Sequence, residues 1–208
     1  MKAMQTFTRA AVAAAMIAAT TSCGDVVRTG RSPMLIVVQK ITGVRGSTTP
    51  STTGVVPLAS DVITLVTTGG SCTIANPCPT FFNDTGIATL SLAPKNISVE
   101  PTSNNVVTIT SAHISYTRTD GLGTPGVDVP FPFDTAVTAT IPTSGSVDVP
   151  FEVVRNSAKL EPPLLALRTN TIILSMIANI TFFGTDLVGN AINVTGTLQI
   201  DFGNFADQ

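Results

Sequence analysis

The only histidine in this sequence is the first residue whose surroundings could support chemistry. His113 lies in NNVVTITSAHISYTRTDG, two positions from Ser111 and two from Ser115. Alternate residues of a strand point to one face, so these side chains and an aspartate could form a Ser-His-Asp arrangement. The candidate aspartates lie in turn-rich stretches, where aspartate commonly shapes the turn: Asp84, Asp120, Asp128, Asp134 and Asp186. No G-x-S-x-G nucleophile motif accompanies them, and we predict that the protein is not an enzyme.

Two cysteines form a second candidate pair. Cys72 and Cys78 stand close together in CTIANPC, with Asn76 and Pro77 available for a turn. In an exported chain this spacing favours a disulfide that closes a small loop. The alternative is half of a metal site, which needs more thiolate or imidazole ligands than one histidine supplies. Calcium would need a denser run of oxygen ligands. We therefore predict a structural disulfide, no metal site and no cofactor.

Four phenylalanines lie in long connections that could bind a partner. Phe81 and Phe82 follow the cysteine pair in CPTFFNDTG, and Phe131 and Phe133 lie in VPFPFD. Their connections, 69–85 and 119–134, are rich in Gly, Pro, Ser and Thr, as is a third at 43–60. Such long loops in a compact domain are commonly functional, and aromatic side chains often dominate binding energy. We expect the loops 69–85 and 119–134 to meet at one end of the domain and to bind a protein or a glycan there. The alternative is that the phenylalanines plug that end of the core.

Alternating apolar residues predict the strands that position these groups. Val147, Val149, Phe151 and Val153 alternate with polar residues in SVDVPFEVVR, and Pro150 assigns this strand to a sheet edge. Within 104–121 the apolar residues change from odd-numbered to even-numbered positions. Such a change predicts a bulge, here near Thr110 or Ser111. The complete set of expected strands is 34–41, 61–68, 86–94, 104–121, 136–142, 146–155, 171–184 and 191–202. Their number and spacing predict an all-β fold, a two-sheet antiparallel β-sandwich.

The first residues have the anatomy of an export signal. Lys2 and Arg9 precede an uncharged apolar run at 10–19, which is too short to cross a bilayer. Small residues then lead to Cys23. An ordinary secretory signal cleaved near Ser22 would explain this pattern, with a cysteine placed there by chance.

This start resembles a bacterial lipoprotein signal, although Thr20 stands where an aliphatic residue is usual. The resemblance implies cleavage before Cys23 and attachment of lipid to that residue. Gly24, rather than aspartate, implies sorting to the outer membrane, on its periplasmic or cell-surface side. The chain then divides into a signal peptide at 1–22, a tether at 23–33 and a single domain at 34–208.

The closing stretch ANITFFGTDLVGNAINVTGTLQIDFG resembles the last hairpin of bacterial immunoglobulin-like and fibronectin type III-like domains. Gly184, Asp186, Gly189 and Asn190 match their turn between two alternating strands. The resemblance implies an immunoglobulin-like sandwich. The stretches YTRTDG, TPGVDVPFPFD and FEVVRNSAK resemble a set of uncharacterised bacterial lipoproteins, which brings no known activity with it.

Composition narrows the function further. Only 12% of residues are charged and the net charge is −2, so no basic patch indicates a nucleic-acid partner. We expect a lipid-anchored cell-envelope protein that acts as a non-catalytic binding or structural module. Its expected partners are the membrane, through the N-terminal lipid, and another envelope protein or a glycan. The alternative is a small-ligand carrier or hydrolase on a β scaffold, which would need a deep pocket.

Overall fold

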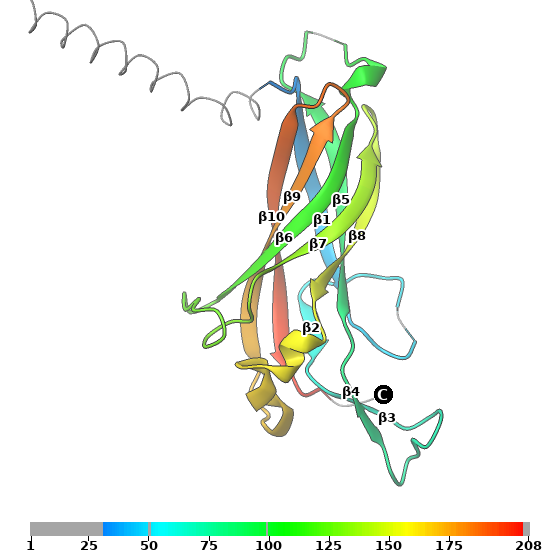
Figure 1. Ribbon diagram of the computed structural model, residues 1–208, viewed down its shortest axis with the longest axis vertical. Coiled ribbons are helices and arrows are strands. Elements are labelled where there is room, and N and C mark those ends of the chain that lie inside the picture. Colours follow the sequence, from blue (N-terminus) through cyan, green and yellow to red (C-terminus); the bar gives the residue numbers. More distant parts are fainter. Residues whose placement is uncertain (1–30, 50, 99, 206–208) are drawn as a thin grey trace, which may run out of the picture.

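The computed structural model describes residues 31–49, 51–98 and 100–205 and confirms an all-β chain. Strands run along most of it, joined by loops and short 3₁₀ helices (Figure 1). The strands are β1 (Met34–Val44), β2 (Leu58–Asp61), β3 (Thr64–Val66), β4 (Cys78–Thr80), β5 (Asp84–Pro94), β6 (Val107–Arg118), β7 (Phe133–Ile141), β8 (Ser146–Val154), β9 (Leu174–Asp186) and β10 (Ala191–Gly203). The 3₁₀ helices are η1 (Ser103–Asn105), η2 (Ser157–Leu160) and η3 (Leu164–Thr169).

Three sheets contain these strands. One has the order β1-β5-β8, a second has the order β2-β10-β9-β6-β7, and β3 with β4 forms a separate hairpin. The expectation of an antiparallel fold throughout is wrong at one edge, because β2 pairs with β10 in parallel. Parallel neighbours need a long connection, and most of the chain separates these two strands.

The sequence patterns locate most of the strands. The predicted bulge is confirmed, since β6 shifts register between Ile109 and Ser111 against both β7 and β9. Strand β8 is at a sheet edge, as Pro150 indicated. The single strand expected at 61–68 is instead divided between β2 and β3. The interruption follows Asp61, whose carboxylate accepts a hydrogen bond from the Ile63 amide.

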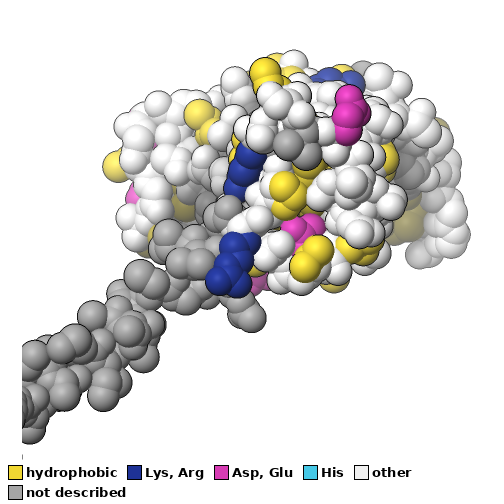
Figure 2. All heavy atoms as spheres, turned by 90° about the horizontal axis from the view of Figure 1, so that it is seen from above, with side chains coloured by type: hydrophobic (Ala, Val, Ile, Leu, Met, Phe, Trp, Pro, Cys, Tyr) yellow, Lys and Arg dark blue, Asp and Glu magenta, His cyan; other side chains and the backbone are white. Residues whose placement is uncertain are grey.

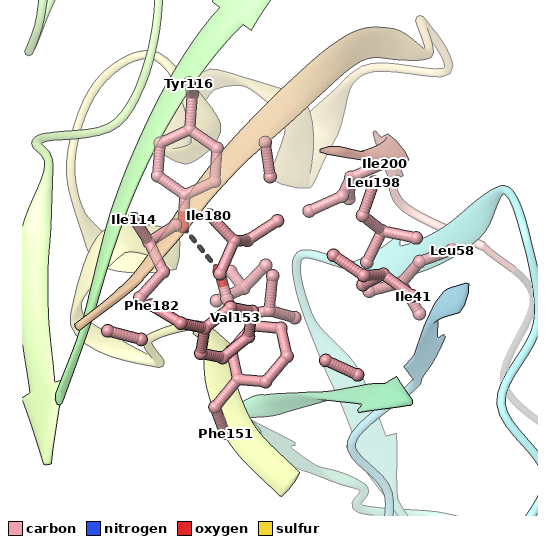
Figure 3. Close-up of a cluster of buried hydrophobic side chains, with 14 of the residues drawn as sticks. Ile41, Leu58, Ile114, Tyr116, Phe151, Val153, Ile180, Phe182, Leu198 and Ile200 are labelled. Atoms are coloured by element: carbon pink, nitrogen blue, oxygen red, sulfur yellow. Dashed lines mark hydrogen bonds between the residues drawn. The ribbon is translucent and has the colours of Figure 1, made fainter. Parts of the chain in front are cut away.

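The two larger sheets enclose one apolar core. Phe151 of β8 meets Phe182 of β9 edge to face, with ring centroids 5.2 Å apart. The Tyr116 hydroxyl of β6 donates to the Val153 carbonyl of β8 at 2.6 Å (Figure 3). Strands β1 and β10 lie side by side, as do β7 and β8. These contacts connect the three-stranded sheet to the five-stranded sheet at several points.

Tyr116 makes the stability of the protein sensitive to alkali. Burial, and then the nearby Asp84 carboxylate, raise the pKa of Tyr116 far above its ordinary value of 10.0. At a pH between the pKa of Tyr116 in the unfolded chain, 10.0, and its higher pKa in the folded chain, the folded chain keeps a proton that the unfolded chain has lost. The stabilisation is therefore complete below pH 10, and the free energy of unfolding falls by about 1.4 kcal/mol per pH unit above it.

Urea denaturation at a series of pH values from 8 to 11 tests this prediction, with Tyr116→Phe as the matched control. In Tyr116→Phe, the free energy of unfolding should lack the part of its decrease above pH 10 that Tyr116 causes. Because Tyr116 is the single tyrosine and there is no tryptophan, phenolate absorbance reports its titration directly. Phenolate formation in the folded protein near pH 10 would contradict the expected shift.

The domain has two distinct ends (Figure 1). At the tether end, Met34 pairs with Pro94, and Val107 pairs with Asp186. This end carries the connections 95–106, 142–145 and 187–190. At the loop end, Val44 pairs with Thr85, and Arg118 pairs with Met176. This end carries the longer connections 45–57, 62–83, 119–132 and 155–173, so the residues predicted to bind lie away from the start of the domain.

Candidate functional site

The cystine hairpin is the part of the loop end that projects farthest from the sheets (Figure 1). Cys72 and Cys78 are joined, as predicted, with their Cα atoms 5.3 Å apart. Strands β3 and β4 form its stem, and the Thr73 and Asn76 backbones pair near its tip. Ile74 is 89% exposed there. In the chain-entropy model, a disulfide that closes so small a loop stabilises the fold by about 2 kcal/mol. The disulfide also restricts the motion of the hairpin tip in the absence of a partner.

The four predicted phenylalanines have different surroundings. Phe133 begins β7 and is buried, with the Arg155 guanidinium 3.9 Å from its ring centroid. Phe81 is half-buried under Arg168, at 4.3 Å. Phe82 is half-buried beside Gly46, where a Cβ would come within 2.6 Å of the Phe82 Cβ. These three are held within the protein by their neighbours.

Phe131 is the exception among the four. Its side chain is 58% exposed, and its ring lies over Gly126 of the same loop. Gly126 has a φ of +76°, a conformation that glycine adopts without strain, and a Cβ there would lie 2.5 Å from the ring. The loop thus supports an aromatic side chain that remains available to a partner.

The segment 155–169 connects the two predicted binding loops. Arg155 donates to the Asp134 carbonyl at 2.8 Å, while the Asn156 amide donates to the Asn83 side chain at 2.6 Å. The structure brings both loops to one end of the domain, and each loop forms a hydrogen bond with the segment 155–169. Direct contact between the two loops stays a prediction.

A buried ion pair beneath the loop end was missed by the sequence analysis. Lys159 of η2 lies 2.9 Å from Asp84 at the start of β5, and their side chains are 1% and 0% exposed. The Ser60 hydroxyl donates to Asp84 at 2.5 Å and the Gly46 amide donates at 2.8 Å. One carboxylate therefore ties together β2, β5, η2 and the loop 45–57. Lys159 lies in the short 3₁₀ helix η2, where the apolar residues follow no strand or helix period. The sequence around Lys159 therefore did not indicate that its side chain is buried.

The aspartates divide between turns and strands. Asp120 and Asp128 lie in turns and accept backbone hydrogen bonds there, which confirms the turn interpretation for these two. Asp186 is the last residue of β9 and accepts amide hydrogen bonds from the turn that follows. A hydrogen bond from the Leu122 amide is the main reason that the pKa of Asp120 lies below its ordinary value. Asp84 and Asp134 instead lie in strands β5 and β7, so the expectation of turns is wrong for them.

His113 pairs with Asp134 on the outer face of the five-stranded sheet. The two residues are opposite each other on β6 and β7, with His113 Nδ1 2.7 Å from an Asp134 carboxylate oxygen. Their side chains are 41% and 79% exposed. Within residues 31–49, 51–98 and 100–205, no hydrogen bond joins Ser111 or Ser115 to His113. The pair forms part of an open polar surface.

A hydroxyl-lined cleft of about 430 Å³ opens beside the loop 45–57. Arg45 forms part of its wall and is held by Asp61 at 2.8 Å. The other polar walls include Ser47, Thr49, Thr53 and Thr64. Hydroxyl groups and one guanidinium suit a polar ligand that accepts hydrogen bonds. Among the described residues, no cluster of three or more His, Cys, Asp or Glu side chains suits a metal ion.

These features define an all-β domain with a disulfide-stapled hairpin and a group of long loops at one end. Comparison of the chain with protein-family models, curated proteins and solved structures gives no significant match. None of the helices in the described part is long and apolar enough to cross a membrane.

Proposed function

We propose that this chain is a lipid-anchored envelope protein whose domain acts as a non-catalytic binding module. Cys23, the expected lipid attachment site, lies outside the described residues, so the anchor rests on the sequence pattern. The observation that carries the proposal is the separation of the two ends. The chain enters the domain at Met34, and the long loops lie at the opposite end (Figure 1).

The dimensions of the domain support this arrangement. Strand β1 has 11 residues and covers about 35 Å at roughly 3.3 Å per residue. A protein anchored through Cys23 would present its loop end at about that distance from the tether end. We also infer that the two facing sheets form the immunoglobulin-like sandwich implied by the closing hairpin. The shared core and the matched turn at Asp186 and Gly189 support this inference.

The chemistry of the loop end favours an envelope protein or a glycan as partner. Ile74 is exposed on the cystine hairpin, and Val127 and Phe131 are exposed on the loop 119–132. Large apolar side chains are the usual anchors of protein interfaces. The outer membrane is the proposed location, on its periplasmic or cell-surface side.

The cleft beside Arg45 favours a second candidate, the carriage of a small polar ligand. Native mass spectrometry of protein released gently from envelopes should then find a bound compound of constant mass. Thr49→Val, which removes a hydroxyl group from the wall, should reduce its occupancy. A spectrum of ligand-free protein alone would exclude this candidate under those conditions.

Fractionation of cells tests the anchor. Cys23→Ala should move the protein from the membrane fraction to the soluble fraction, because the lipid attachment site is gone. Cys72→Ser with Cys78→Ser is the control, since these cysteines lie in the hairpin and should leave the location unchanged. Retention of the Cys23→Ala chain in the membrane fraction would contradict the proposal.

Photo-crosslinking in intact cells tests the binding end. A photoreactive residue at position 131 should give a discrete adduct, and the same residue at position 144 of the tether-end turn should not. Phe131 and Ser144 are both exposed, so solvent access does not distinguish the two positions. Equal adducts, or none at position 131, would argue against a binding site at the loop end.

A further inference from the structure

The start of the domain is fastened firmly to the tether end. Ser32 is 1% exposed, its hydroxyl oxygen accepts a hydrogen bond from the Met34 amide at 3.4 Å, and its side chain lies beside Asp186 at the end of β9. The Pro33 carbonyl accepts a hydrogen bond from the Lys95 amide at 2.9 Å. The residues that lead into β1 therefore lie beside the end of β9 and the start of the connection 95–106.

Exposed aliphatic side chains surround this point. Leu187 is 62% exposed, Val188 is 75% exposed and Ile97 is 92% exposed. Turn positions are usually occupied by polar residues, glycine and proline, so three large aliphatic side chains at two tips need an explanation. Strands and turns here hold them on the surface beside the entry point.

The turn that carries Leu187 and Val188 is held in one shape. Asp186 accepts hydrogen bonds from the Val188 amide at 3.1 Å and from the Asn190 amide at 2.8 Å. Gly189 supplies the positive φ of 86° that the turn requires. The aliphatic side chains are thus presented by an ordered backbone, which reduces the entropy lost when they enter an apolar environment.

The charges at this end are few. Arg31 and Lys95 are exposed beside the entry point, Glu100 lies in the connection 95–106, and Asp186 is buried in its turn. Figure 2 looks onto this end and shows scattered hydrophobic side chains, with both Lys or Arg and Asp or Glu side chains among them. Aliphatic tips with adjacent cations are the combination that favours a lipid headgroup region.

We propose that the tether end docks on the bilayer, with Leu187, Val188 and Ile97 entering the boundary between headgroups and acyl chains. Arg31 and Lys95 then lie at the level of the lipid phosphates. This inference rests on the proposed lipid anchor at Cys23. The path from Cys23 to Arg31 can extend to at most about 30 Å, which keeps this end close to the membrane. Tethering raises the effective concentration of the surface, so a weak contact suffices.

Docking would also orient the domain. A lipid on a tether alone allows the domain to tumble, whereas contact through two tips directs the loop end away from the bilayer. The loop-end side chains, Phe131 among them, would then face a partner across the compartment or beyond it.

Environment-sensitive labels on the full lipidated chain in vesicles test the proposal. Val188→Cys places a fluorophore at the tether end, and Val127→Cys, a valine that is 67% exposed at the loop end, is the matched control. The label at position 188 should shift to shorter wavelength and be quenched by brominated phosphatidylcholine and phosphatidylglycerol. The label at position 127 should retain the spectrum of a water-exposed dye. Ile97→Cys should behave like Val188→Cys.

Flotation of the same vesicles separates the two proposals. If the chain floats with the vesicles and the labels at positions 188 and 97 remain as water-exposed as the label at 127, docking is overturned and the anchor stands. If the chain purified from bacterial membranes fails to float, the lipid anchor is overturned, and docking with it.

Discussion

Replacement of Asp84 by alanine is expected to lower the free energy of unfolding by about 3–5 kcal/mol, because it leaves a buried ammonium group without its counter-ion. Asp84 and Lys159 are 0% and 1% exposed, so bulk water does not solvate the ammonium group that remains. The Ser60 hydroxyl and the Gly46 amide also lose their acceptor. Urea denaturation followed by circular dichroism measures the loss.

A double variant separates the charge effect from general damage to the core. Asp84→Asn with Lys159→Met removes both charges. The asparagine oxygen can still accept from the Gly46 amide, while its NH2 group can donate to the Ser60 hydroxyl. The double variant should recover most of the stability lost in Asp84→Ala, because a neutral replacement of a buried ion pair often costs little. A double-mutant cycle then gives the coupling energy of the pair. If Asp84→Ala cost less than about 1 kcal/mol, as exposed ion pairs do, the pair would not be buried as described.

Phe182→Ala is the second substitution with a large expected effect, a loss of about 3–5 kcal/mol. The side chain is 0% exposed in the core between the sheets. Its ring meets Phe151 edge to face at 5.2 Å, and such pairs add stability beyond the area they bury. The truncation would leave a cavity where β8 and β9 face each other (Figure 3). Thermal and urea denaturation both report the change.

The adjacent residue provides the control for this prediction. Phe183 points to the opposite face of the same strand and is 41% exposed. Because it lies outside the core, Phe183→Ala should change the free energy of unfolding by no more than about 0.5 kcal/mol. Similar losses for the two variants would contradict the orientation of β9.

The strands were predictable where one face is buried and the other is not. Phe182 and Phe183 illustrate this, because apolar residues alternate along β9 and Phe182 lies on the buried face while Phe183 lies on the exposed one. The bulge in β6 was predictable for the same reason, since a change in the parity of apolar residues needs an extra residue in the strand. The strand predicted at 171–184 starts later in the structure: β9 begins at Leu174, and Ile172 before it is 59% exposed.

The contacts between distant segments could not be read from these patterns. Asp84 was assigned to a turn, and nothing near Lys159 in the sequence identifies a partner far away along the chain. The same holds for the arginines that cover Phe81 and Phe133. Arg168 comes from a segment with no strand or helical periodicity, and the alternation that ends at Arg155 does not identify Phe133 as its partner. The sequence singled out the loops and their aromatic residues, whereas the segment 155–169 that organises them emerged only with the folded chain.

The other end of the described chain has a practical consequence for binding assays. The Phe205 amide contacts Asp61 at 3.3 Å, and the Asn204 side chain donates to the Arg168 carbonyl at 2.7 Å, so these residues lie at the loop end. An affinity tag appended after Gln208 would therefore emerge beside the proposed binding loops. Immobilising the protein on a sensor chip through such a tag would turn those loops toward the chip and hide them from a partner in solution. Immobilisation through the lipid, or through a tag inserted in the turn 142–145, would leave the binding loops accessible to a partner in solution.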